Sequence, residues 1–159
     1  MPTAEQAFGA GLTHRVAGAT GCRRECRAEA VTATAQRDIP CAPESARASR
    51  RFVAEWLTAW GLVEVVDVAE LLVSELVGNA ARYTGCTRLR VHVALQGPVV
   101  RVGVRDSSAA LPVLLVACDD AENGRGLGLI AALSHRFGVT PEQPGKTVWF
   151  ELRTDSQRC

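Results

Sequence analysis

The sequence lacks an excess of charge of either sign. Its 159 residues carry 18 basic and 17 acidic side chains, which gives a formal net charge of +1. A protein that coats DNA or an anionic membrane by bulk electrostatics needs a clear basic excess. We therefore expect neither direct binding to nucleic acid nor binding to a membrane surface.

Long hydrophobic runs are absent as well. The longest apolar stretch, Val113–Cys118, is far shorter than the roughly 20 residues that a membrane-spanning helix needs. No basic segment followed by an apolar core stands at the N-terminus, so we expect no secretory signal and a cytoplasmic protein. Hydrophobic residues still make up 47 %, which is enough for a packed domain and excludes wholesale disorder.

Lysine is nearly absent: 17 of the 18 cations are arginine, and the other is Lys146. We expect Lys146 to be a solvated residue in a turn. The six cysteines form an even set, but a chain of this length and hydrophobicity needs no disulfides. Cys22 and Cys26 are four residues apart with only His14 near them, which does not match a zinc site. We expect reduced thiols.

Composition divides the chain into three parts. Residues 1–36 are rich in Ala, Gly, Thr and Arg, and we expect a flexible extension there. Residues 37–153 are expected to form one domain, and residues 154–159 a short tail. Apolar spacing predicts helices over 43–60, 64–83 and 129–133, and alternation predicts strands over 88–95, 99–105, 137–140 and 147–152. This order favours an α+β fold, a two-layer α/β sandwich with the helices on one face of the sheet.

Two sets of polar residues interrupt these patterns. Glu75 and Asn79 are four residues apart, so they project from one face of a helix beside its apolar side, as partners in a site or as a solvated face. Asp106 ends a strand, where a carboxylate either caps a turn or accepts a hydrogen bond from a ligand amino group.

A glycine-rich segment precedes the short helix at 129–133. Gly124, Gly126 and Gly128 alternate there, and such glycines let backbone N–H groups approach phosphate oxygens. Arg125 adds a charge-assisted contact to phosphate in this interpretation. The simpler alternative is a flexible loop that ends in glycine.

Two better-known nucleotide motifs fit less well. Gly145-Lys146-Thr147 matches the end of a P-loop, but Thr140 stands where the first glycine is needed and no helix follows. Gly126-x-Gly128-x-x-Ala131 fits the shorter Rossmann fingerprint, but no strand leads into it and too few residues follow for further βαβ units. A Rossmann-type oxidoreductase is therefore only a weak alternative.

Four segments taken in order resemble one family. Glu75-Leu-Val-Gly-Asn79-Ala-Ala-Arg-Tyr83-Thr resembles the N box of the GHKL ATPase superfamily, whose ATP-binding unit is the Bergerat fold. Residues 104–108 and 124–129 resemble its two glycine boxes, and residues 145–150 its closing strand. Over residues 37–153 the chain is most similar to the stand-alone RsbW- and SpoIIAB-type anti-sigma-factor serine kinases, in the actinobacterial HATPase_c-like subgroup. Histidine kinases fit less well, because no dimerisation helix with a phosphoacceptor histidine precedes the domain.

The resemblance implies a mixed, largely antiparallel Bergerat sheet and a role for each matching residue. Asn79 would hold Mg²⁺ through its side-chain oxygen, and Glu75 would be the base that takes the proton of an attacking serine. Asp106 would accept from the adenine amino group, with Thr147 near the base, and the second glycine box would form a lid over the phosphates. The residues assigned to ATP are Asn79, Asp106, Ser108, Gly124, Arg125, Gly126, Leu127, Gly128 and Thr147.

The sequence departs from the family pattern at two places. Tyr83 stands where these small proteins often have histidine, and Ser108 and Ala110 replace the glycines that usually follow the aspartate. The resemblance implies an Mg²⁺- and ATP-dependent serine/threonine kinase that phosphorylates a STAS-domain antagonist, holds a sigma factor and forms homodimers. A nucleotide-binding module that sequesters a partner without phosphotransfer is the alternative.

Overall fold

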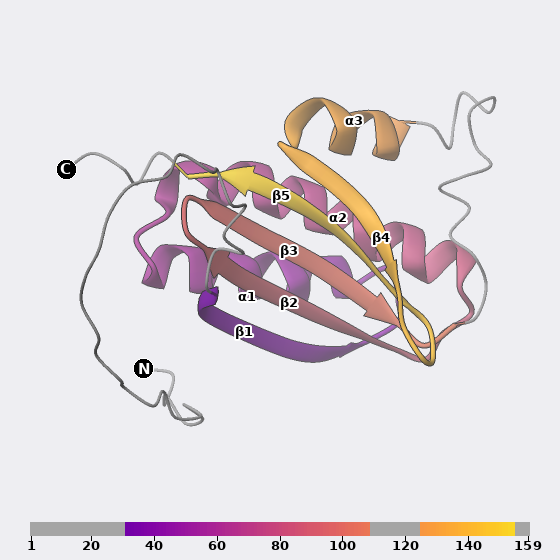
Figure 1. Cartoon of the computed structure of the whole chain (residues 1–159). Helices are drawn as coiled ribbons and strands as arrows, with labels where there is room; N and C mark the ends of the chain where they lie inside the picture. The colour runs from indigo at the N-terminus through magenta and orange to yellow at the C-terminus, as the bar shows by residue number, and fades with distance from the viewer. Residues whose placement is uncertain (1–30, 109–124, 155–159) are drawn as a thin grey trace, which may run out of the picture.

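The computed structural model describes residues 31–108 and 125–154, which form a sheet with helices behind it (Figure 1). Gly124, Ala110 and most of the predicted extension lie outside these residues. The strands are β1 (Val31–Pro40), β2 (Arg88–Gln96), β3 (Val99–Asp106), β4 (Arg136–Pro141) and β5 (Lys146–Arg153). The helices are α1 (Ser45–Ala59), the short 3₁₀ helix η1 (Val63–Val65), α2 (Val66–Tyr83) and α3 (Arg125–Leu133).

The sheet has the strand order β1-β2-β3-β5-β4, and all four pairings are antiparallel. The α+β sandwich predicted from the sequence is thus confirmed. A mixed sheet would contain a parallel pair of strands, and no such pair occurs among the described strands. Tight turns explain the pairing of β2 with β3 and of β4 with β5, since an antiparallel pair needs only a short connection. Gly97, at φ +55°, lies in the first of these turns.

The core lies between the sheet and the two long helices. α1 and α2 run behind the sheet, and α3 packs against α2 (Figure 1). Each fully buried aliphatic or aromatic side chain contributes about 1.5–3 kcal/mol relative to its exposed state. The largest fully buried side chains include Leu57 of α1, Leu72 and Val77 of α2, Leu89 and Val91 of β2, Val102 of β3, Ile130 of α3 and Phe150 of β5.

The sequence pattern predicted no strand where β1 lies. It pairs with β2 from Val31, opposite Gln96, to Pro40, opposite Arg88. The sequence pattern missed it because an edge strand buries little, and Ile39 is its only deeply buried hydrophobic residue among those whose exposure is described. The folded unit therefore includes residues that composition had assigned to a flexible extension.

A disulfide holds the end of β1 in place. Cys41 follows the last residue of β1, Cys86 follows α2, and their Cα atoms are 5.9 Å apart. The Cys41 backbone N–H also donates to the Thr87 carbonyl oxygen at 2.9 Å. The expectation of reduced thiols is thus wrong for this pair. The other four cysteines lie outside the described residues.

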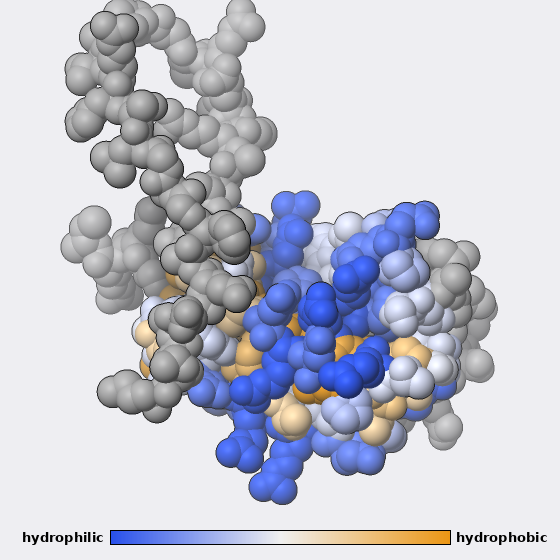
Figure 2. All heavy atoms as spheres, turned by 90° about the horizontal axis from the view of Figure 1, so that it is seen from below, coloured by the Kyte–Doolittle hydropathy of each residue, from blue (hydrophilic) through white to orange (hydrophobic). Residues whose placement is uncertain are grey.

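The side of the molecule at β1 is polar. Seen from below, where β1 lies in Figure 1, hydrophilic residues dominate and hydrophobic ones show only between them (Figure 2). Arg37 and Asp38 are exposed there, and Asp38 pairs with Arg90 of β2 at 2.7 Å. Charged side chains on an edge strand discourage pairing with another chain. Within the described residues, no helix is both long and apolar enough to cross a membrane.

His92 gives the outer face of the sheet a pH-dependent stability. Its ring lies over Gly103, and burial lowers the pKa of His92 from its ordinary 6.5. The charge of Glu142 raises this pKa and the charge of Arg101 lowers it, but burial has the largest effect. The unfolded state therefore binds a proton more readily, and the native state loses stability as the pH falls through about 6.5.

We expect the wild type to lose more free energy of unfolding between about pH 7.5 and 5.5 than His92→Gln. Urea unfolding at the two pH values measures the difference, and His135→Gln, at an exposed histidine, is the matched control. Equal losses in the wild type and in His92→Gln would contradict the prediction.

Candidate nucleotide-binding site

Glu75 and Asn79 face the first turn of α3. They lie one turn apart on α2, both half-buried, as their spacing predicted. A Cβ atom placed on Gly126 would lie 2.6 Å from Glu75 Oε2 and 3.8 Å from Asn79 Nδ2. The carboxylate and the carboxamide therefore converge on the backbone of α3, and a Cβ atom at position 126 would require the Glu75 carboxylate to shift.

The glycine-rich segment is helical where the structure describes it. α3 begins at Arg125, so Gly126 and Gly128 lie within its first turns, whereas the sequence suggested a loop that ends at Gly128. Gly128 is exposed, and a Cβ there would meet nothing within 4 Å. Gly124 lies outside the described residues, and so do the side chains of Arg125 and Leu127. The N-terminal turn of α3 remains the part of this segment that faces Glu75.

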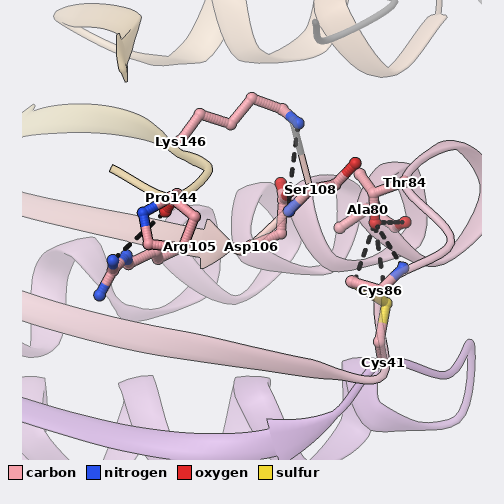
Figure 3. A network of polar contacts seen from close by, with 9 residues as sticks. All are labelled: Cys41, Ala80, Thr84, Cys86, Arg105, Asp106, Ser108, Pro144 and Lys146. Atoms are coloured by element: carbon pink, nitrogen blue, oxygen red, sulfur yellow. Dashed lines mark hydrogen bonds and ion pairs between the residues drawn. A yellow bond between two sulfur atoms is a disulfide. The ribbon is translucent and has the colours of Figure 1, made fainter. Parts of the chain in front are cut away.

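Asp106 ends β3 as a buried carboxylate with two donors on one oxygen. The Ser108 backbone N–H donates to Asp106 Oδ1 at 2.9 Å, and Lys146 Nζ donates to the same atom at 3.1 Å (Figure 3). The Asp106 side chain is 2 % exposed and the Lys146 side chain 6 %. The first contact is the turn cap that the sequence allowed. The second shows that the prediction of a solvated Lys146 is wrong.

Gly145 brings Lys146 to this position. Its φ of +94° lies in the left-handed region, and a Cβ there would be 1.9 Å from the Asp106 carbonyl oxygen. The turn between β4 and β5 is therefore pressed against the end of β3, where Asp106 and Lys146 are paired in the register. Any other residue at position 145 would push the two strand ends apart.

Thr147 lies on the other face of the sheet. Successive side chains of a strand point to opposite faces, and Phe150 of β5 points into the core, so Lys146 faces the helices and Thr147 does not. The Thr147 hydroxyl donates to Glu142, and its methyl group lies beside Gly103 on the face that carries His92. The structure thus separates Thr147 from Asp106, and the sequence analysis overlooked Lys146 as the residue that meets it.

The donor set of the site fits a nucleotide and Mg²⁺. The Asn79 carboxamide offers a hard oxygen atom of the kind that Mg²⁺ prefers, and phosphate oxygens commonly complete its shell. Because Gly126 has no Cβ atom, the α3 backbone lies close to the Glu75 and Asn79 side chains. No group of three or more His, Cys, Asp or Glu side chains able to hold a metal by themselves occurs in the described part of the chain.

Comparison with known proteins gives a family match and a similar solved structure. The histidine kinase-like ATPase domain family matches residues 39–152. No curated protein matches significantly. A similar solved structure is the histidine kinase domain of a blue-light activated histidine kinase from Erythrobacter litoralis EL346, with 19 % identity and a TM-score of 0.47. That match covers 75 % of this chain and 63 % of the other, so the chain spans less than two thirds of that domain's length.

The antiparallel sheet with α1 and α2 behind it, and the polar residues of α2 and β3, define an α+β domain with the GHKL ATP-binding fold. The chain belongs to the histidine kinase-like ATPase domain family, which matches it over most of its length.

Proposed function

We propose that the protein is an ATP-binding regulatory factor of the anti-sigma type, with serine/threonine kinase activity. The observation that carries this proposal is the convergence of Glu75 and Asn79 on Gly126. A carboxylate near the transferred phosphate is what a kinase needs and a purely sequestering module does not.

Each residue has a role in the proposed reaction. The hydroxyl oxygen of a substrate serine or threonine attacks the γ-phosphorus of ATP, the bond to the β-phosphate oxygen breaks, and ADP leaves. Glu75 takes the proton from the attacking hydroxyl. Asn79 holds Mg²⁺, which when bound neutralises charge on the phosphates. Asp106 accepts from the amino group of adenine and so orients the nucleotide.

The proposed partners follow from the resemblance of the sequence motifs to the anti-sigma kinases. The substrate is a small STAS-domain antagonist, phosphorylated on serine or threonine. The second partner is a sigma factor, which the protein keeps from RNA polymerase until the antagonist competes for it. Homodimer formation belongs to the same proposal, and the site of action is the cytoplasm.

The alternative is a nucleotide-binding module that acts by sequestration alone. Ser108 favours it, because a serine in place of a glycine stiffens the backbone next to Asp106. Phosphotransfer separates the two proposals, since both include nucleotide binding.

We expect Glu75→Gln to lower phosphotransfer about 100-fold and to leave ATP affinity within about twofold, because the variant loses a base and keeps the shape of the side chain. The protein is incubated with labelled ATP, Mg²⁺ and the STAS proteins of its own genome, and label on each STAS protein is measured. Asn79→Ala should instead weaken Mg²⁺-dependent ATP binding. Glu70→Gln, on the same helix, is the matched control.

Two outcomes would contradict the proposal in different ways. If the wild type binds ATP but labels no STAS protein, sequestration is the function. If neither ATP nor ADP binds at millimolar concentration, the nucleotide-binding role itself is wrong.

A further inference from the structure

The ion pair of Asp106 and Lys146 bears on which base the site accepts. A carboxylate has two oxygen atoms that accept hydrogen bonds, and Asp106 Oδ1 already takes two from the chain itself. Asp106 Oδ2 is therefore the oxygen better placed to accept from a bound base. Beside it stands an ammonium group with three N–H donors, so donation to Asp106 does not exhaust what Lys146 can donate. The two side chains together present an acceptor next to a donor.

We propose that Lys146 is a second base-reading residue of the nucleotide site, and this inference rests on the proposed function. Asp106 Oδ2 accepts from the amino group of adenine, and Lys146 Nζ donates to a ring nitrogen beside that amino group. Adenine has acceptor nitrogens, N1 and N7, on either side of its amino group, so its edge offers the donor and the acceptor that the pair requires. β3 and β5 then each contribute one contact to the base.

The same pair disfavours guanine. Guanine is commonly recognised by a carboxylate whose two oxygens accept from its two neighbouring N–H groups. Here the backbone of Ser108 and the ammonium of Lys146 occupy Oδ1, so only one of the two groups finds an acceptor. An unmatched buried donor lowers affinity, and we expect ATP to bind at least about tenfold more tightly than GTP.

The surroundings of Lys146 favour a defined role for its head group. The ammonium is held by the turn at Gly145, where no side chain fits, and is shielded from water with its partner. Hydrogen bonds are stronger in such surroundings than in water. A lysine that served only solubility would project into solvent.

The test measures nucleotide affinity by isothermal titration with four ligands: ATP, GTP and the triphosphates of 1-deazaadenosine and 7-deazaadenosine, each of which lacks one ring nitrogen. The wild type should lose about tenfold in affinity with one deaza analogue and little with the other. Relative to the wild type, Lys146→Met should bind ATP about tenfold more weakly. It should bind the sensitive deaza analogue as tightly as the wild type does, because that analogue already lacks the nitrogen that Lys146 contacts. Lys146→Gln, which keeps an N–H donor, should recover part of the loss. Arg136→Met, an exposed cation on β4, is the control.

The outcomes separate the inference from the proposed function. If Lys146→Met lowers the affinity for ATP and for both analogues equally, the role of Lys146 is structural and the inference is overturned. Unchanged or tighter binding of ATP by this variant overturns it as well. Equal affinity of the wild type for ATP and both analogues overturns it without any variant, even if Lys146→Met fails to fold. Wild-type protein that binds none of the four nucleotides overturns the proposed function as well.

Discussion

Lys146→Met is expected to lower the free energy of unfolding by about 3 kcal/mol. The substitution keeps the volume of the side chain and removes its charge, so Asp106 stays buried with the Ser108 N–H but without its ammonium partner. A buried carboxylate that loses its counter-ion keeps the cost of desolvation and loses the attraction that offset it. Chemical denaturation with urea measures the change.

The double variant Asp106→Asn/Lys146→Met should recover most of this loss. The carboxamide introduced at position 106 still accepts from the Ser108 N–H, and no charge remains buried, so replacing both members of the pair is close to neutral. The double-mutant cycle should therefore give a coupling energy of about 2 kcal/mol. The exposed pair Asp38 and Arg90 is the matched control, and its cycle should give a much smaller coupling, further reduced by salt. Additive effects at Asp106 and Lys146 would show that the two side chains do not interact as described.

Reduction of the Cys41–Cys86 disulfide is expected to lower the free energy of unfolding by about 4 kcal/mol. The two cysteines are 45 residues apart, so the bond closes a long loop and removes many conformations from the unfolded chain. The loss should appear as a lower urea midpoint when reductant is added to the wild type.

The variant Cys41→Ala/Cys86→Ala provides the control. It should unfold at the midpoint of the reduced wild type, and reductant should not change it further. Mass spectrometry of a peptide digest without reductant should recover residues 41 and 86 in one linked fragment. A wild-type midpoint that does not respond to reductant would contradict the prediction.

Much of the fold was predictable because long elements repeat their signal. The apolar spacing of α2 and the alternation of β2 and β3 each run over several turns or pairs, so single deviations did not hide them. β1 has no such repetition, because Ile39 alone among its described side chains is a buried large hydrophobic residue and hydrogen bonds to β2 define the rest. The disulfide was unpredictable for the same reason, since Cys41 reaches Cys86 only when β1 is in place.

The site was predicted in part. Glu75 and Asn79 share a face of α2 because helix geometry is set by spacing alone. Lys146 was expected to be solvated, and the faces of β5 were not separated, because Trp149 on its outer side makes both faces of the strand look apolar. Counting back by twos from Phe150 would have placed Lys146 toward the helices. That Asp106 carries two intramolecular donors depends on the approach of the Gly145 turn, and sequence spacing says nothing of that distance.

The register of β5 against β3 decides which residue meets Asp106. A slip of β5 by one residue would exchange the faces of Lys146 and Thr147. A hydroxyl would then lie beside Asp106, and the only lysine of the protein would turn outward. Changes in the length of the turn between β4 and β5 that keep this register leave the ammonium beside Asp106.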